Sequence, residues 1–119
     1  MSTKSGGVSP ARGEIWEVDL NPTVGREQAG RRPALIVSDN ALNSGPRGLV
    51  IVIPVTGTAR GLPSHVSVTP PEGGLTKPSV IMTEQVRSVS KDRLGRRYGM
   101  VTQVTMNQVD RILRIVLGL

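Results

Sequence analysis

Two pairs of adjacent residues in this chain carry the side chains that phosphate chemistry needs. Arg32 and Pro33 open one aliphatic run, and Thr56 and Gly57 close another. An arginine holds a phosphate through a planar fork of N–H donors and keeps its charge at neutral pH. A threonine hydroxyl adds a donor that can stabilise charge developing on phosphate oxygens. If the two strands are neighbours, the side chains converge, although such pairs are also common at ordinary strand ends.

The polar stretch before Arg32 supplies further groups that can contact a ligand, namely Arg26, Glu27, Gln28 and Arg31. The Gln28 amide can bond a base edge or a phosphate, or simply face water. We expect Glu27 to order the loop by pairing with Arg31 or Arg26. In an extended segment Arg31 points away from Arg32, because successive side chains alternate.

Other common enzyme sites are missing from the sequence. There is no cysteine, no phosphate-loop signature and no cluster of metal ligands. The acidic residues are scattered singly, so we expect no metal and no cofactor. His65 is the only histidine, and we expect it to have a structural or peripheral role.

The charge of the chain favours a polyanionic partner. Fifteen Lys and Arg stand against nine Asp and Glu, which gives a net charge of +6 and a pI of about 11.1, and twelve of the fifteen are arginine. Such an excess promotes binding to nucleic acid through counterion release. Solubility alone is the competing explanation.

The elements that must position these residues are short strands separated by polar loops. Residues 13–20 alternate, with Trp16, Val18 and Leu20 on one buried face. Pro33 is expected at the start of its strand, and Pro54 at an edge or bulge, because proline cannot donate to a ladder. Residues 90–95 are expected to form a short helix capped by Ser90 and ended by Gly95, and residues 39–48 a turn or a single helical turn. The expected strands are 13–20, 33–38, 49–56, 65–68, 79–89 and 96–104.

The C-terminal segment predicts an amphipathic helix. Thr105 and Gln108 have the spacing of a capping box. Asp110 and Arg114 can pair across one turn. An apolar stripe follows the box, formed by Val109, Ile112, Leu113, Val116 and Leu117. Together the elements predict the α+β class with a small, strongly curved sheet or barrel, in one domain over 12–119 behind a disordered tail, 1–11.

Several motifs in combination resemble the MazF/PemK family of toxin endoribonucleases. They are "RGEIWEVDL" at 12–20, "GREQAGRRPALIVS" at 25–38, "VIPVT" at 52–56, "LPSHV" at 62–66 and "TEQVRSV" at 83–89. The resemblance covers nearly the whole chain. Two residues depart from the usual pattern: Arg26 replaces a small polar residue, and Ala29 replaces a glycine.

The resemblance implies an SH3-like β-barrel with added helices that works as a homodimer. The absence of cysteine fits a reducing cytoplasm, where we expect the protein. It implies metal-independent, sequence-selective cleavage of single-stranded RNA, especially mRNA, and a cognate antitoxin that blocks the RNA groove. The family's catalytic arginine and threonine correspond to Arg32 and Thr56. Glu27 and Gln28 lie in the loop that lines or gates the RNA groove in relatives.

The chemistry implied by this resemblance suits the two residues. The 2′-hydroxyl attacks the adjacent phosphate and gives a 2′,3′-cyclic phosphate, so charge builds on the non-bridging oxygens. We expect Arg32 to hold that charge, because a guanidinium is a poor proton acceptor. We expect the Thr56 hydroxyl to donate to the phosphate or to the leaving oxygen.

The expected RNA-binding residues are Arg26, Glu27, Gln28, Arg31 and Gln85. If 79–89 is one strand, Gln85 faces opposite to Glu84 and Arg87, so that Gln85 reaches RNA while Glu84 is structural. Trp16 and Tyr98 are the only possible stacking platforms, and Trp16 is expected in the core.

Two other functions remain open from the sequence. The chain can be a CcdB-like toxin that binds and poisons gyrase without nuclease activity, or a catalytically silent RNA-binding relative. The Arg32–Pro33 pair and Thr56 favour the nuclease. Exposed strand edges and a small core favour a dimer. Family relatives pair through the barrel and the C-terminal helix, so the resemblance implies that helix residues near 113–117 contribute partly to its interface.

Overall fold

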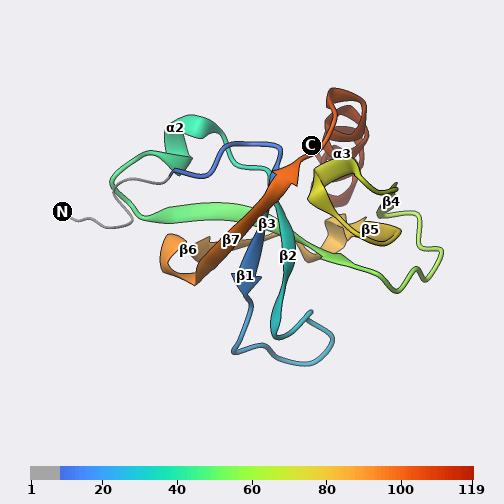
Figure 1. Ribbon diagram of the computed structural model, residues 1–119, viewed down its shortest axis with the longest axis horizontal. Coiled ribbons are helices and arrows are strands. Elements are labelled where there is room, and N and C mark those ends of the chain that lie inside the picture. The colour runs from blue at the N-terminus through green and yellow to red at the C-terminus, as the bar shows by residue number, and fades with distance from the viewer. Residues whose placement is uncertain (1–8) are drawn as a thin grey trace.

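The computed structural model describes residues 9–119, which form an antiparallel sheet with one long helix (Figure 1). The strands are β1 (Glu14–Asp19), β2 (Arg31–Ile36), β3 (Leu49–Thr56), β4 (His65–Val68), β5 (Ser79–Met82), β6 (Arg87–Ser90) and β7 (Leu94–Met100). The helices are α2 (Asn40–Asn43) and α3 (Gln103–Leu117), with 3-10 turns η1 (Glu72–Gly74), η2 (Thr83–Gln85) and η3 (Lys91–Arg93). None of these helices is long and apolar enough to cross a membrane.

The sheet is built around β3, which has different partners along its length. The order is β4-β5-β3-β2-β1-β7, and β6 pairs with the first half of β3 while β5 pairs with its end. The sheet therefore bends along β3, which crosses the molecule in Figure 1. The α+β class and the C-terminal helix are confirmed. The path of paired strands does not join β4 to β7, so the expected barrel is an open one.

The two faces of the sheet are buried in separate clusters. Ile15, Leu35 and Ile53 belong to the cluster that packs against α3, whose Val109 is fully buried. Trp16, Val18, Ala34 and Val52 belong to the other cluster, which includes Val89 of β6. Trp16 is 7% exposed, which confirms that it is a core residue and not a stacking platform. Alternation along β1, β2 and β3 produces these two faces.

The segment expected as a single strand, 79–89, is interrupted by η2. Five residues lie between Ile81 and Arg87, whereas two lie between their partners on β3, Val55 and Val52. The three extra residues leave the sheet as η2, in the manner of a large β-bulge. The backbone N–H of Thr83 donates to the Ser64 carbonyl at 3.3 Å, and the Thr83 hydroxyl donates to the same oxygen at 2.5 Å. The prediction of one continuous strand is wrong, since alternation stops at Thr83.

The prolines occupy positions where the sheet needs no donor. Pro33 lies within β2, opposite Glu17 of β1, so the prediction that it starts the strand is wrong by two residues. Pairing of β2 with β3 begins only at Ala34. Pro54 lies opposite Ala34 and between the two parts of β3 that pair with β6 and β5. A missing N–H costs no ladder bond at such a gap.

The helix α3 begins one turn earlier than the sequence predicts. Thr102 is its N-cap, and the Thr102 hydroxyl accepts from Thr105 N–H at 3.2 Å. Glu72 of η1 accepts from Thr102 N–H at 2.9 Å and from the Thr105 hydroxyl at 2.5 Å. The cap was misplaced because Thr105 lies inside the first turn, and because its acidic partner comes from a distant segment. Gly118 ends the helix at φ 72°, in the left-handed region.

Three smaller expectations have mixed outcomes. Ser90 caps its turn as predicted, but the turn ends at Arg93, and Gly95 lies in β7. Asp110 pairs with Arg12 at 2.5 Å and not with Arg114. That pair ties the segment before β1 to α3.

The expected tail, 1–11, falls partly outside the described residues, which begin at Ser9. Within the described part, Pro10 is buried, and Ala11 N–H donates to the Glu14 carboxylate at 2.7 Å.

Candidate functional site

The register of β2 and β3 brings the two candidate catalytic residues to one row. Ala34 lies opposite Pro54. The same register continued by two residues puts Arg32 across from Thr56. Directly opposed residues share a face of the sheet, so both side chains lie on the same side. Pairing of β2 with β3 stops at Ala34, so the shared face agrees with the expected convergence, which stays a prediction; Arg32 and Thr56 are called the row below.

The two residues differ in exposure. Thr56 is 9% exposed, and its hydroxyl accepts from Thr58 N–H at 3.2 Å, in the turn that leaves β3. The hydroxyl keeps its own hydrogen to donate elsewhere. Arg32 is partly exposed, and its Nε donates to the Ala29 carbonyl at 2.9 Å. The fixed hydroxyl and the longer, accessible cation suit contact with one phosphate.

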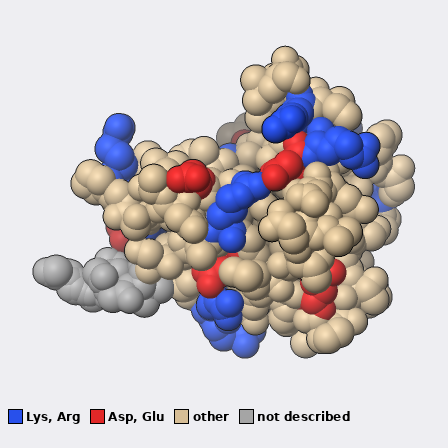
Figure 2. Space-filling model, turned by 90° about the horizontal axis from the view of Figure 1, so that it is seen from above, with Lys and Arg blue, Asp and Glu red and all other residues tan. Residues whose placement is uncertain are grey.

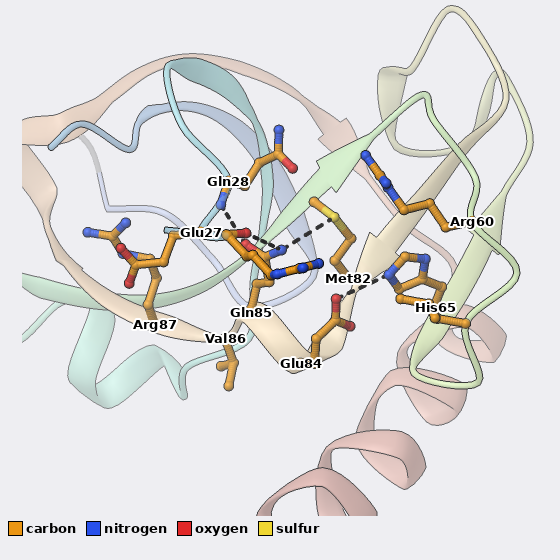
Figure 3. A pocket seen from close by; sticks show the side chains of 11 residues that line it. Glu27, Gln28, Arg60, His65, Met82, Glu84, Gln85, Val86 and Arg87 are labelled. Atoms are coloured by element: carbon orange, nitrogen blue, oxygen red, sulfur yellow. Dashed lines mark hydrogen bonds and ion pairs between the residues drawn. The ribbon is translucent and has the colours of Figure 1, made fainter. Parts of the chain in front are cut away.

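A hollow of about 630 Å³ is lined by Gln28 and ten other residues (Figure 3), and neither Arg32 nor Thr56 is among them. Its wall comes from three separate segments: loop 21–30, the loop before β4 with the first residue of β4, and the stretch from the end of β5 through η2 to the start of β6. The lining residues are Arg26, Glu27, Gln28, Arg60, Leu62, His65, Met82, Glu84, Gln85, Val86 and Arg87. Apolar groups and hydrogen-bonding groups both line this space, which suits an unstacked base with its phosphates.

Strand pairing places the hollow on the same face as Thr56. Val80 of β5 lies opposite Thr56, and Met82, two residues on, lies opposite His65 of β4. Residues two apart on a strand share a face. Because Met82 and His65 line the hollow, the hollow continues the row that Arg32 and Thr56 begin.

Gln28 connects the hollow to Arg32. Its backbone N–H donates to Gln85 Oε1 at 2.6 Å. Its side-chain amide lies against Arg32. With the amide oxygen assigned to the Arg32 side on hydrogen-bonding grounds, that oxygen is 2.5 Å from Nε, 2.9 Å from Nη2 and 3.2 Å from Nη1. Among the described residues, Gln28 is thus the one that both lines the hollow and forms a hydrogen bond with Arg32.

His65 and Glu84 form a hydrogen-bonded pair at the other end of the hollow. His65 Nε2 lies 3.2 Å from Glu84 Oε2, and the Ser64 hydroxyl donates to Glu84 Oε1 at 2.6 Å. Burial raises the pKa of Glu84, but the hydrogen bonds from Ser64 and His65 outweigh it and hold that pKa below its ordinary value. The His65 side chain is 5% exposed, and its Nδ1 has no hydrogen-bond partner among residues 9–119. A buried, carboxylate-bound ring agrees with a structural role.

Comparison with known proteins identifies the family. A model of the PemK-like, MazF-like toxin of type II toxin–antitoxin systems matches residues 11–117. The chain belongs to this family. It is 37% identical over 113 residues to endoribonuclease MazF9 of Mycobacterium tuberculosis, across 91% of this chain and 96% of the relative. It is 35% identical over 109 residues to endoribonuclease EndoA of Bacillus subtilis, across 91% and 94%.

Solved structures agree with the family assignment. MazF of Deinococcus radiodurans superposes with a TM-score of 0.84 at 30% identity, over 94% of this chain and 99% of that one. A mycobacterial endoribonuclease in complex with its cognate antitoxin superposes at 0.77 and 33% identity, over 93% and 97%. The resemblance seen in the sequence is confirmed. The named relatives are endoribonucleases, and they support the nuclease reading and not the gyrase-binding one.

The MazF-like fold brings four of the five expected RNA-binding residues together. Arg26, Glu27, Gln28 and Gln85 all line the hollow. Arg31 does not: it is exposed beside Glu17, at 3.8 Å, and alternates away from Arg32 on β2.

Two expectations about side-chain roles need correction. Glu27 orders the loop as predicted, but through a hydrogen bond from Val24 N–H at 2.6 Å, with no ion pair to an arginine in the described chain. Gln85, Glu84 and Arg87 do not face opposite sides, since η2 breaks the alternation and all three line the hollow.

The hollow also contains residues that the sequence did not single out as RNA contacts. Arg60, in the loop after Thr56, and Arg87, on β6, add two cations to Arg26. The charge of the chain predicts such arginines but not their location. Figure 2 shows basic and acidic side chains interspersed on the face it views, so the net charge does not gather there. Among residues 9–119, no three of His, Asp and Glu lie together as a metal site would require.

Proposed function

We propose that this chain is an endoribonuclease toxin that cleaves single-stranded RNA, with Arg32 and Thr56 at the scissile phosphate. The observation that carries the proposal is the row they share, beside a hollow lined by three arginines and by amide side chains. Membership of a toxin family with two named endoribonucleases among its members supports it.

The reaction follows from the groups in the row. The 2′-hydroxyl oxygen forms a bond to phosphorus as the bond from phosphorus to the 5′-oxygen breaks, and the proton of the hydroxyl ends on that leaving oxygen or on water. Arg32 stabilises the negative charge on the non-bridging oxygens, since its guanidinium keeps its charge throughout. The Thr56 hydroxyl donates to the phosphate or to the leaving oxygen.

The hollow holds the nucleotide next to the scissile phosphate. A base taken out of the single strand packs on the apolar side chains Leu62 and Met82 that line the hollow. Arg26, Arg60 and Arg87 lie where they can meet flanking phosphates. The protein therefore selects short sequences, mRNA included.

Partner and assembly follow from the same relatives and from the surface. A relative was solved with its cognate antitoxin, and we propose that an antitoxin binds this chain and blocks the hollow. We propose a homodimer, because the end of α3 exposes apolar side chains: Ile115 is 69% exposed and Leu117 is 53% exposed. We place the protein in the cytoplasm, where mRNA is available.

The test is cleavage of a long single-stranded RNA by the purified chain in EDTA, with both new ends mapped. A 2′,3′-cyclic phosphate and a 5′-hydroxyl are expected. An RNA with 2′-deoxy substitution 5′ to the scissile phosphate should bind but resist cleavage, because the nucleophile is gone. Cleavage of that substrate at the normal rate would mean that water attacks. A chain that cuts no RNA but inhibits gyrase would replace this proposal by the other toxin function.

A further inference from the structure

The tip of the loop between β1 and β2, residues 23–29, is held to the body of the protein at a single point. Most of these residues are exposed, and the Val24–Glu27 bonds lie within the tip itself. In the described chain, the hydrogen bonds that reach the tip from any element other than β2 come from one side chain, Gln85. Its Oε1 accepts from Gln28 N–H at 2.6 Å, and its Nε2 lies 3.5 Å from the Arg26 carbonyl.

Gln85 can reach the tip because η2 lifts it out of the sheet. The 3-10 turn is fixed at its start by the bonds of Thr83 to the Ser64 carbonyl, where Thr83 itself is fully buried. It is followed at once by β6, which pairs with β3 from Arg87 onward. Gln85 therefore extends from a segment that is held at both ends, while the tip it contacts has no other hydrogen-bonded partner in the described chain except Arg32 of β2.

The contact continues from the tip to the guanidinium. The Gln28 amide oxygen lies within 3.2 Å of all three nitrogens of Arg32. An oxygen in the guanidinium plane can approach two nitrogens along one edge but not all three. The Gln28 oxygen consequently lies over the face of the group, while Nε donates to the Ala29 carbonyl. Apart from Gln28, no described residue accepts a hydrogen bond from Nη1 or Nη2, so these two nitrogens can donate to a phosphate.

We propose that Gln85 and Gln28 are positioning residues for Arg32: Gln85 anchors the loop tip, and the anchored Gln28 holds the guanidinium face so that its outer edge meets the scissile phosphate. This rests on the proposed role of Arg32 in RNA cleavage. It assigns Gln85 Oε1 to an internal bond instead of a base contact. It also explains why a loop of small and polar residues can hold a long side chain in one place, as a phosphate site requires.

The first test measures the anchor without RNA. Hydrogen exchange of the Gln28 backbone amide is followed by NMR in the wild type, Gln85→Ala, Gln85→Glu and a matched control, Gln108→Ala, on the exposed face of α3. Exchange should be slow in the wild type, at least about tenfold faster in Gln85→Ala, and slow again in Gln85→Glu, which keeps an acceptor oxygen. Unchanged exchange in Gln85→Ala would overturn the anchor.

The second test measures the consequence for cleavage. A misplaced catalytic group costs on the order of 100-fold in rate, so kcat of Gln85→Ala should fall by about that factor with little change in KM. Gln85→Glu should recover most of the rate, Gln108→Ala should match the wild type, and the cleavage sites should stay the same. A changed set of cleavage sites would overturn the proposal, since a base-reading residue behaves that way.

Gln28→Ala separates the two links. It keeps the backbone N–H that Gln85 accepts but removes the oxygen over Arg32, so exchange at residue 28 should stay slow while kcat falls. In the Gln85→Ala background the same change should cost less than it does alone, because the two residues act in series. If the losses in kcat of the two single variants added fully in the double variant, the proposal that Gln85 and Gln28 act in series would be wrong. A wild type that cleaves no RNA would instead refute the proposed function, and the exchange result alone would then decide the anchor.

Discussion

The two parts of the candidate site are held in place by different means. Arg32 and Thr56 lie on strands, and the register of β2 and β3 fixes where their backbones are. The hollow is assembled from three segments, two of them mainly loops, and it depends on single hydrogen bonds such as that from Gln28 N–H to Gln85. The row gives the site its chemistry, and the hollow gives it selectivity.

This contrast explains how one small fold can serve many target sequences. Strand positions change little when a loop residue is replaced, so the groups at the phosphate stay in register. Loop residues such as Arg26 and Arg60 can change without disturbing the sheet, because their side chains lie outside the core. Mutations in the row should therefore affect rate, and mutations of exposed loop arginines in the hollow, such as Arg26 and Arg60, should affect affinity or sequence choice.

The largest effect should come from the row. Arg32→Ala and Thr56→Ala should each lower kcat by about 100- to 1000-fold, the usual cost of losing one donor to developing charge. RNA binding should fall less, because the hollow is intact. Single-turnover cleavage and equilibrium binding measure the two quantities.

Two conservative variants serve as controls for the row. Thr56→Ser keeps the hydroxyl and should keep most of the rate. Arg32→Lys keeps the charge but loses the planar fork, so it should remain strongly impaired. If Arg32→Ala abolished binding but left kcat unchanged, the division between row and hollow would be wrong.

The row could be predicted from the sequence, whereas much of the hollow could not. The motifs around Arg32–Pro33 and Thr56 identified the family, and the aliphatic runs identified the strands. The break at η2 had no local signal, because "TEQVRSV" continues a strand-like pattern while the need for a bulge arises from pairing with β3. Gln85 and Arg87 were consequently assigned to opposite faces.

The same physical reason accounts for the misplaced helix cap. The pattern Thr105–Gln108 is a sound local signal, but Glu72, thirty residues away from Thr102, supplies the acceptor that defines the actual start. Long-range hydrogen bonds of this kind decide details that local spacing cannot. The loop contact between Gln28 and Gln85 belongs to the same class.

The next largest effect should be on RNA affinity, and it should differ between the face that holds the hollow and the face that carries Arg31. Arg26→Ala should weaken RNA binding and reduce the salt slope by about 0.7, the value for one single-strand phosphate contact. Arg31→Ala should do much less, because Arg31 lies beside Glu17, outside the hollow. Binding titrations at several salt concentrations test both. Equal losses in the two variants would extend the RNA path beyond the hollow face and restore the sequence-based assignment of Arg31.

The row and the hollow belong to one chain, and the oligomeric state tests whether a second copy of the chain contributes to them. Light scattering at micromolar concentration should give the mass of a dimer. Leu117→Glu, in the exposed apolar end of α3, should shift it toward the monomer, while Asn107→Glu, also exposed on α3, should not. If the monomeric variant still folds but loses cleavage, a second copy completes the hollow. A wild-type monomer would refute the dimer.

The mildest effect on cleavage is expected at the far end of the hollow. His65→Ala should reduce cleavage far less than either row substitution, because the ring is buried and bound to Glu84. Its cost should appear mainly as lower stability, since a large buried side chain is lost. Thermal unfolding and single-turnover rates on the same samples separate the two. A rate loss as large as that of Arg32→Ala would make His65 a catalytic residue.

The smallest effect should be the pH dependence contributed by Glu84. Burial raises the pKa of Glu84, but the hydrogen bonds from Ser64 and His65 lower it by more than burial raises it. The folded pKa therefore lies below the unfolded value of about 4.3. A carboxylate of this kind stabilises the fold above its unfolded pKa, and the stabilisation is lost as the pH falls through its folded pKa. Glu84→Gln should therefore melt a few degrees lower than the wild type at neutral pH, with the difference vanishing in acid. The effect is small because the side chain is 34% exposed and solvent screens its interactions.

Asp92→Asn, on the exposed turn η3, serves as the control and should show no such trend. A difference between Glu84→Gln and the wild type that stayed constant down to the acid limit would show that shape, and not charge, is what Glu84 contributes to the hollow.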